Sequence, residues 1–211
     1  MPNRATVEHI IREEPQTISA AYTFSTAPVF ATPALSTTGN GTVAGTGTTA
    51  VERGDGVVHQ TVLTLAALPI TVRDTEQGGG QKIYDFPLGR ILIQGVRAKD
   101  VTFTTTSVLA DTLNASVTLN WGVGTTTQAN ATLATTEQDL IPVTAATSSA
   151  TINVANTATS AALAASAQFD GTSTAADAFM NLAVAGATDI DANATVTVAG
   201  TVTITWVNLG A

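Results

Sequence analysis

The stretch that decides the fold is ATVTVAGTVTITWVNLG, residues Ala194–Gly210. Threonine alternates there with an aliphatic or aromatic residue on both sides of Gly200, and the second half ends near Trp206. Successive side chains of a β-strand leave opposite faces of the sheet, so a period of two predicts a half-buried strand. We interpret the stretch as two strands joined as a hairpin across Gly200, with threonine on the exposed face.

The same alternation recurs along the chain. In SVTLNWGVG, residues Ser116–Gly124, Leu119 and Trp121 fall on one face and Thr118 and Asn120 on the other. Further short apolar runs follow at intervals typical of an all-β domain: Val57–Leu65, Leu68–Val72, Ile83–Phe86, Arg90–Val96, Val101–Thr106, Leu140–Val143, Thr151–Val154 and Phe179–Val184. The expected fold class is all-β, an antiparallel β-sandwich for which a jelly roll is one permitted topology, with both tryptophans in its core.

Three segments depart from this pattern. Gly78-Gly79-Gly80 predicts a loop between Arg73 and Lys82. Ala161–Phe169 is rich in alanine and predicts one or two turns of helix. Asp170-Gly171 is typical of a turn.

Residues 1–50 read as an extended N-terminal arm and flexible linker, and residues 51–211 as the β-sandwich domain. The run STTGNGTVAGTGTTA, which ends at Ala50, has too few apolar side chains to hold a packed element. Two interpretations of residues 1–50 stay open, a disordered tail and an arm that orders on a neighbouring subunit. Apolar residues such as Val7, Ile10 and Tyr22 favour attachment, because they would be buried against a partner.

Composition limits the function classes. The formal net charge is −8, with only two lysines and six arginines, so we expect no binding to nucleic acid or to an anionic membrane surface. The absence of cysteine excludes disulfides, thiolate chemistry and cysteine-based metal sites. The charge-free run Ile141–Phe169 is mostly Ala, Thr, Ser and Asn, which does not favour a membrane-spanning helix. The charged N-terminus, MPNRATVEHIIREEP, lacks the apolar core of a secretory signal peptide.

Candidate chemical groups are few. His9 and His59 are the only histidines, and we interpret His59 as a hydrogen-bonded structural residue that shares a face with Thr61. The three consecutive glycines lack the spacing of a phosphate-binding loop. Asp189 and Asp191 could offer oxygen ligands to Ca²⁺, but the rest of a calcium loop is missing, and a turn between strands explains them better.

Two carboxylate pairs have the residue types that glycoside hydrolysis requires, Asp74 with Glu76 and Glu137 with Asp139. No aromatic cluster accompanies either pair in the sequence. We therefore predict no enzyme activity and assign no catalytic, cofactor-binding or metal-ligating residue. The segment YDFPLGR, Tyr84–Arg90, reads either as a set of interface anchors or as a tight corner with its phenylalanine in the core.

Several stretches together resemble a family of virion proteins from tailed bacteriophages. They are ERGDGVVHQTVLTL, YDFPLGRILIQGV, TTEQDLIPVT and, near the end, NLAV followed by DIDANATVTVAGTVTITWVNLG. The resemblance covers residues 51–211. Proteins of this family resemble capsid decoration, or cement, proteins. It implies a structural β-sandwich subunit, made in the host cytoplasm, that sits on the outer capsid surface and binds between subunits of the major capsid protein.

Self-association is also expected, most simply as a homotrimer, because only 11% of the residues are charged and much uncharged surface needs cover. Two other classes stay as alternatives. A fibre or surface module for adsorption or carbohydrate binding would need an exposed aromatic platform. A glycosidase would need two facing carboxylates in a cleft.

Overall fold

A computed structural model describes residues 41–43, 45–54, 57–105, 118–128, 130–147, 152–154, 168–185 and 193–210. These ranges hold ten β-strands and one short 3₁₀ helix, η1, at Thr135–Glu137. The strands are β1 (Thr48–Gly54), β2 (Val58–Val72), β3 (Gly78–Asp85), β4 (Gly89–Thr105), β5 (Thr118–Gly124), β6 (Ile141–Thr147), β7 (Ile152–Val154), β8 (Gln168–Gly171), β9 (Asp177–Ala185) and β10 (Ala194–Asn208).

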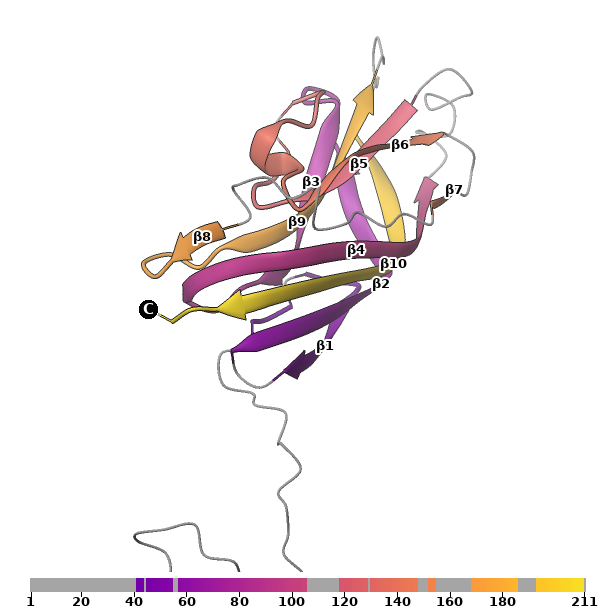
Figure 1. Cartoon of the computed structure of the whole chain (residues 1–211). Helices are drawn as coiled ribbons and strands as arrows, with labels where there is room; N and C mark the ends of the chain where they lie inside the picture. The colour runs from indigo at the N-terminus through magenta and orange to yellow at the C-terminus, as the bar shows by residue number, and fades with distance from the viewer. Residues whose placement is uncertain are drawn as a thin grey trace, which may run out of the picture. The chain divides into compact units, whose positions relative to one another are not determined.

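Two antiparallel sheets pack against each other (Figure 1). The six-stranded sheet has the order β1-β2-β10-β4-β7, and β8 also pairs with β4. The four-stranded sheet has the order β3-β9-β5-β6. This arrangement confirms the predicted all-β sandwich; the jelly-roll topology stays a prediction.

Strand β10 lies at the centre of the larger sheet, between β2 and β4. Its inward residues, Val196, Val198, Val202, Ile204 and Trp206, are fully buried. Its threonines are half-exposed on the outer face. The alternation in the sequence therefore predicted both faces of the strand, and the buried positions of Trp121 and Trp206 are confirmed.

The predicted hairpin at Gly200 is wrong, because β10 is one continuous strand. Instead, both neighbouring strands have a bulge close to Gly200. On β4, the two residues Asp100 and Val101 lie opposite Gly200. On β2, Ala67 is the extra residue between the partners of Val198 and Ala199. Gly200, Ala67 and Asp100 all have positive φ angles, of 140°, 99° and 53°. A Cβ on Gly200 would lie 2.8 Å from the carbonyl oxygen of Asp100. The extra residues bend three adjacent strands at one level and keep the apolar side chains facing inward on both sides of the bend.

These bulges also explain why strand lengths differ from the prediction. The runs Val57–Leu65 and Leu68–Val72 fall on the single strand β2, which begins at Val58. Arg90–Val96 and the described residues 101–105 of the next run fall on the single strand β4. In the sequence a bulge breaks the alternation for one or two residues, which looks the same as a turn.

The glycine run Gly78-Gly79-Gly80 is not a loop but the first part of β3. A Cβ on Gly79 would collide with the carbonyl oxygen of Thr71 on β2. Glycine is therefore required where the edge of one sheet approaches the other closely. Asp170-Gly171, predicted as a turn, pairs with β4 as part of β8.

The predicted domain boundary at residue 50 falls inside β1. Before that strand, Thr42 pairs with Asp85 through two backbone hydrogen bonds, and the carbonyl of Gly47 accepts from the amide of Ala66. Other predictions concern residues outside the described ranges: the arm up to Asn40, His9, Asp189, Asp191 and residues 161–167 of the predicted helical turns. The last two residues of that helix prediction, Gln168 and Phe169, lie instead in strand β8.

Replacing Trp206 with Ala should lower the free energy of unfolding by about 3–5 kcal/mol, because a fully buried ring would leave a cavity. The matched control is Thr203→Ala on the outer face of the same strand, for which we expect less than about 1 kcal/mol. Urea unfolding followed by circular dichroism measures both. Equal losses for the two variants would show that the sandwich does not depend on this core.

Candidate functional site

The carboxylate pair Glu137 and Asp139 holds the connection between β5 and β6. Asp139 accepts hydrogen bonds from the backbone amide (2.9 Å) and the hydroxyl (2.7 Å) of Thr125. Glu137 accepts from the amide of Ala134 (2.9 Å) at the start of η1. Burial raises the pKa of Asp139 above its ordinary value. Both carboxylates bind neighbouring loop backbone, which is a structural use of such groups.

Asn181 of β9 fixes the same connection from the adjacent strand. Its side-chain oxygen accepts from the amide of Gln128 (2.9 Å), and its side-chain nitrogen donates to the carbonyls of Thr126 (2.9 Å) and Glu137 (2.8 Å). The residue is fully buried. Sequence reasoning missed it, since a single asparagine in NLAV has no pattern that distinguishes it from an exposed one.

The other pair, Asp74 and Glu76, lies in the turn between β2 and β3. The backbone amide of Asp74 donates to the side-chain oxygen of Asn193 (2.9 Å). Glu76 accepts from the hydroxyl of Thr75 (2.7 Å). The structure therefore places the two predicted pairs in separate loops, at β2–β3 and β5–β6.

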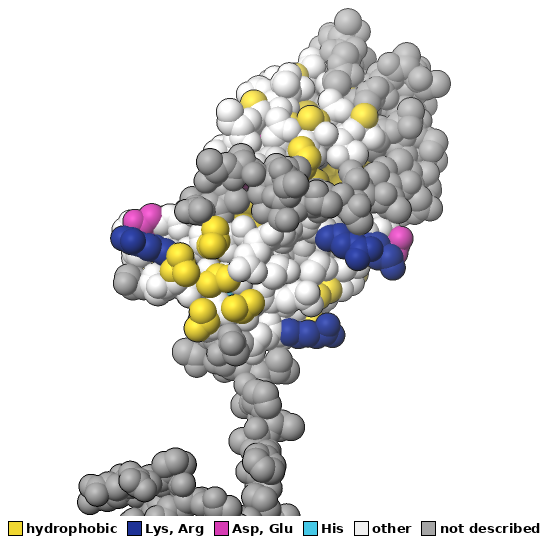
Figure 2. Space-filling view, viewed as in Figure 1, with side chains coloured by type: hydrophobic (Ala, Val, Ile, Leu, Met, Phe, Trp, Pro, Cys, Tyr) yellow, Lys and Arg dark blue, Asp and Glu magenta, His cyan; other side chains and the backbone are white. Residues whose placement is uncertain are grey.

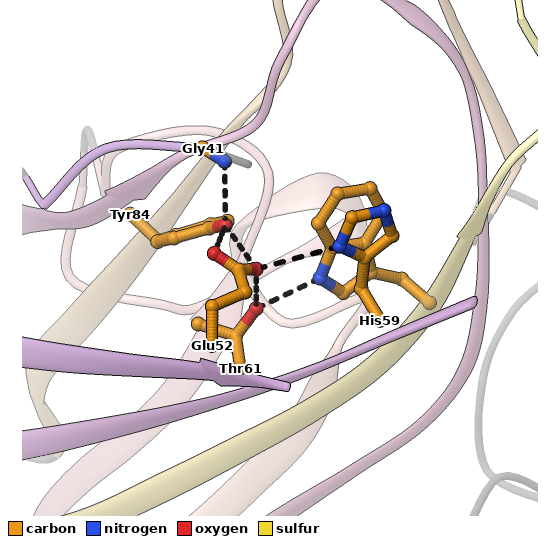
Figure 3. A network of polar contacts seen from close by, with 6 residues as sticks. Gly41, Glu52, His59, Thr61 and Tyr84 are labelled. Carbon is orange, nitrogen blue, oxygen red and sulfur yellow. Dashed lines mark hydrogen bonds and ion pairs between the residues drawn. The ribbon is translucent and has the colours of Figure 1, made fainter. Parts of the chain in front are cut away.

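A buried polar network lies between β1, β2 and β3 (Figure 3). The carboxylate of Glu52 is at its centre, with the hydroxyl of Tyr84 at 2.7 and 2.9 Å from its two oxygens. The hydroxyl of Thr61 donates to the same carboxylate (2.6 Å) and accepts from the indole N–H of Trp206 (2.8 Å). The backbone amide of Gly41 donates to the Tyr84 hydroxyl (2.9 Å). The network joins an edge strand of each sheet and the segment that precedes β1.

His59 completes this network. Its ring stacks on Trp206, with centroids 3.9 Å apart and planes 6° from parallel, and Nδ1 lies 4.0 Å from Oε1 of Glu52. Its side chain is 1% exposed. His59 and Thr61 are both buried, as their predicted shared face requires. The predicted hydrogen bond is not seen among the described residues, where Nε2 of His59 has no hydrogen-bond partner. Trp206, which stacks on His59, also packs edge-on against Phe86, so the network borders the hydrophobic core.

The segment Tyr84–Arg90 was predicted either as a set of interface anchors or as a tight corner with its phenylalanine in the core, and it has features of both. Phe86 is 2% exposed and packs edge-on against Trp206, so the core interpretation holds for this residue. Leu88 is 61% exposed, and Arg90 points outward from the start of β4. Nearby, Lys82 bridges Asp177 (2.7 Å) and Asp85 (3.7 Å) across β3 and β9.

The outer face of the six-stranded sheet is the strongest candidate for an interaction surface. We define it by the outward residues of β1, β2, β10 and β4, among which threonine is the most frequent type. Exposed apolar side chains lie at the end of this sheet where β10 ends, among them Val58 and, just beyond the strand, Leu209. Figure 2 shows this gathering of hydrophobic side chains, with Lys and Arg side chains at its left edge and toward the opposite side of the face.

A shallow hollow lies in the middle of this face. Thr203 and Thr205 of β10 form its floor, and Gln60, Val62 and Arg97 stand around it. The register explains the hollow: Thr205 pairs with Gly95 on β4, where no side chain fills the space. Sequence reasoning did not find it, because its residues come from three strands that are distant in the chain.

Comparison with known proteins gives no match to any family model, to any curated protein or to any solved structure. Within the described ranges, no group of three or more His, Asp or Glu side chains could hold a metal ion. The same ranges contain no helix with the length and apolar character needed to cross a membrane.

Tyr84→Phe should lower stability by about 1–3 kcal/mol, because the Glu52 carboxylate loses a donor and the Gly41 amide an acceptor. Native-state hydrogen exchange should accelerate at Gly41, while the Ala66 amide, bonded to Gly47, serves as the control. Equal acceleration at both amides would indicate general loosening, and no change at Gly41 would contradict the role of Tyr84.

The same variant tests a pH dependence. Burial is the main cause that raises the pKa of Tyr84, with Glu52 adding to it, so the folded state favours the neutral phenol. The stability this provides is complete below the ordinary tyrosine pKa of about 10 and is lost as the pH rises above it. Urea unfolding at about pH 8 and pH 11 should show a smaller alkaline loss for Tyr84→Phe than for the natural chain.

Proposed function

We propose that this chain is a structural virion protein that decorates and stabilises the outer surface of a tailed-phage capsid by binding between capsid subunits. The observation that carries the proposal is the outer face of the six-stranded sheet. It combines exposed apolar side chains and arginines with uncharged threonines, and a low density of charge with arginine present is typical of the centre of a protein-binding surface. The resemblance of several segments to phage virion proteins points to the kind of assembly that this face would bind.

The polar groups of the interior support a structural role. The carboxylates of Glu52, Glu137 and Asp139 accept hydrogen bonds from groups of the same chain. A stable, well-connected sandwich suits a subunit that reinforces a shell under internal pressure. In this proposal the protein is a homotrimer bound to the major capsid protein on the outer capsid surface. The net charge of −8 fits that position, because an acidic protein is repelled by the packaged nucleic acid.

The alternative, a carbohydrate-binding or adsorption module, has one observation in its favour, the polar hollow at Thr203 and Thr205. The aromatic side chains argue against it. Five of the seven aromatic residues in the described ranges are buried, and the other two, Phe169 and Phe179, are half-buried. A stacking platform for sugar rings would need exposed ones.

Capsids assembled without this chain, from the phage genome that encodes it, should bind the purified protein saturably in co-sedimentation. They should also resist heat or low salt better once it is bound. Light scattering should give three times the 21.4 kDa mass of one chain. Failure to bind such capsids, or tight salt-sensitive binding to duplex DNA, would contradict the proposal.

The arm is tested in the same assay. Because Gly41 and Thr42 are bonded to Tyr84 and Asp85, the deletion should remove residues 1–40 and leave those contacts in place. We expect the shortened chain to unfold at the same urea concentration and to bind capsids more weakly. Unchanged binding would show that the arm has no part in attachment.

A further inference from the structure

The charges of the described residues are separated between the outer face of the six-stranded sheet and the rest of the fold. The outer face has four of the six lysines and arginines in the described ranges, and the other two, Arg73 and Lys82, lie on or beside β3. The four are Arg53, Arg90, Arg97 and Lys99, and each is exposed. An acidic chain therefore presents one face with an excess of positive charge.

Carboxylates of the chain neutralise only part of that excess. Lys99 lies 3.3 Å from its neighbour Asp100, and Asp170 on β8 pairs with Arg90 in the strand register. Arg97 has no carboxylate within ion-pair distance among the described residues. Its guanidinium is thus available to a group from outside the chain.

Arg97 stands in a row that crosses four strands. Val51 on β1 pairs with Val62 on β2, which pairs with Thr203 on β10, and that residue pairs with Arg97 on β4. The row has an apolar half and a polar half, and the hollow lies at their junction. The next row adds Thr205 between Gln60 and Gly95.

The chemistry of this arrangement matches a carboxylate side chain. A guanidinium binds a carboxylate through two parallel hydrogen bonds, and threonine hydroxyls on the floor can donate others. Val62 offers an apolar wall for the methylene groups that carry a glutamate carboxylate. Because the floor is already paired as β-sheet, these donors are held in place before a partner arrives.

We propose that the hollow receives a glutamate or aspartate side chain from an acidic protein surface, with Arg97 as the anchor. The inference rests on the proposed function and names the chemistry of the capsid surface that the chain would bind. The exposed valines of the same face, Val51 at 54% and Val58 at 44%, would pack around the anchor.

Nucleic acid fits the face less well. A polyanion backbone needs a continuous run of cations, whereas Asp100 and Asp170 stand beside two of the four here. The apolar residues Val51 and Val58 would gain nothing from phosphates. A protein surface uses both the arginine and the valines.

The experiment compares Arg97→Glu with Arg73→Glu in the full chain. Both replace an exposed arginine with the same change of charge, but Arg73 lies at the turn after β2, outside the outer face. The probe is immobilised poly-L-glutamate, with heparin and a DNA duplex as polyanions of other classes. We expect Arg97→Glu to weaken binding to poly-L-glutamate at least about tenfold and Arg73→Glu to change it less than about twofold. Raising the salt from about 50 to 300 mM should weaken the natural chain's binding.

Arg97→Lys separates charge from geometry, because lysine keeps the charge but not the guanidinium fork. It should retain part of the binding and lose more than Arg73→Glu does. Equal effects of Arg97→Glu and Arg73→Glu, or no binding of poly-L-glutamate by the natural chain, would overturn the inference. Binding of heparin or DNA more tightly than poly-L-glutamate would also overturn it. Dissociation of the oligomer by Arg97→Glu would overturn it as well, because the hollow would then be occupied by a second copy of the chain.

The capsid assay separates this inference from the proposed function. If the natural chain and Arg97→Glu bind capsids equally, the anchor is wrong and the decoration role stands. If the chain binds poly-L-glutamate through Arg97 but binds no capsid, the hollow is confirmed and the proposed function is wrong.

Discussion

The packing of β10 against the second sheet is the interaction on which the rest of the structure depends. Its inward side chains are fully buried, and burial of each large apolar side chain contributes about 1.5–3 kcal/mol. Aromatic contacts extend the core: the ring of Trp206 lies 5.5 Å from Phe86 after β3, and Trp121 on β5 lies 5.8 Å from Phe103 on β4. Since β10 pairs with both β2 and β4 along most of their length, a loss of this packing would affect three strands together.

The carboxylate of Glu52, whose side chain is only 11% exposed, imposes a second constraint. An ionised carboxylate that leaves water is costly unless several donors bind it, and here Tyr84 and Thr61 do so at 2.6–2.9 Å. These donors belong to β3 and β2, so the edge strand β1 is held by side chains as well as by its backbone ladder. The Glu52 side chain thereby fixes the position of β1 relative to an edge strand of the other sheet.

The sequence was sufficient for the fold class because alternation is local. Residues two apart on β5 and β10 indicate their own faces, and both tryptophans followed from that rule. The bulges at Gly200 and Ala67 and the close approach at Gly79 could not be predicted, because each depends on a neighbouring strand distant in the chain. The polar network was hidden for the same reason: Glu52 and Tyr84 are 32 positions apart, and Thr61 and Trp206 are 145 apart. The hollow around Arg97 combines three strands, so no single segment could indicate it.

The threonines whose alternation predicts the strands also determine which partners the outer face of the sheet can bind. Because the outward positions of β10 are uncharged, the field over the sheet is set by the few cations on the flanking strands. With little competing charge nearby, one guanidinium is then enough to select an acidic group, while neighbouring hydroxyls and valines fix its position. A densely charged face would bind polyanions of many kinds, and a purely apolar one would aggregate. A sparse, ordered face of this type favours a partner that repeats one acidic feature at fixed spacing, as a regular protein lattice does.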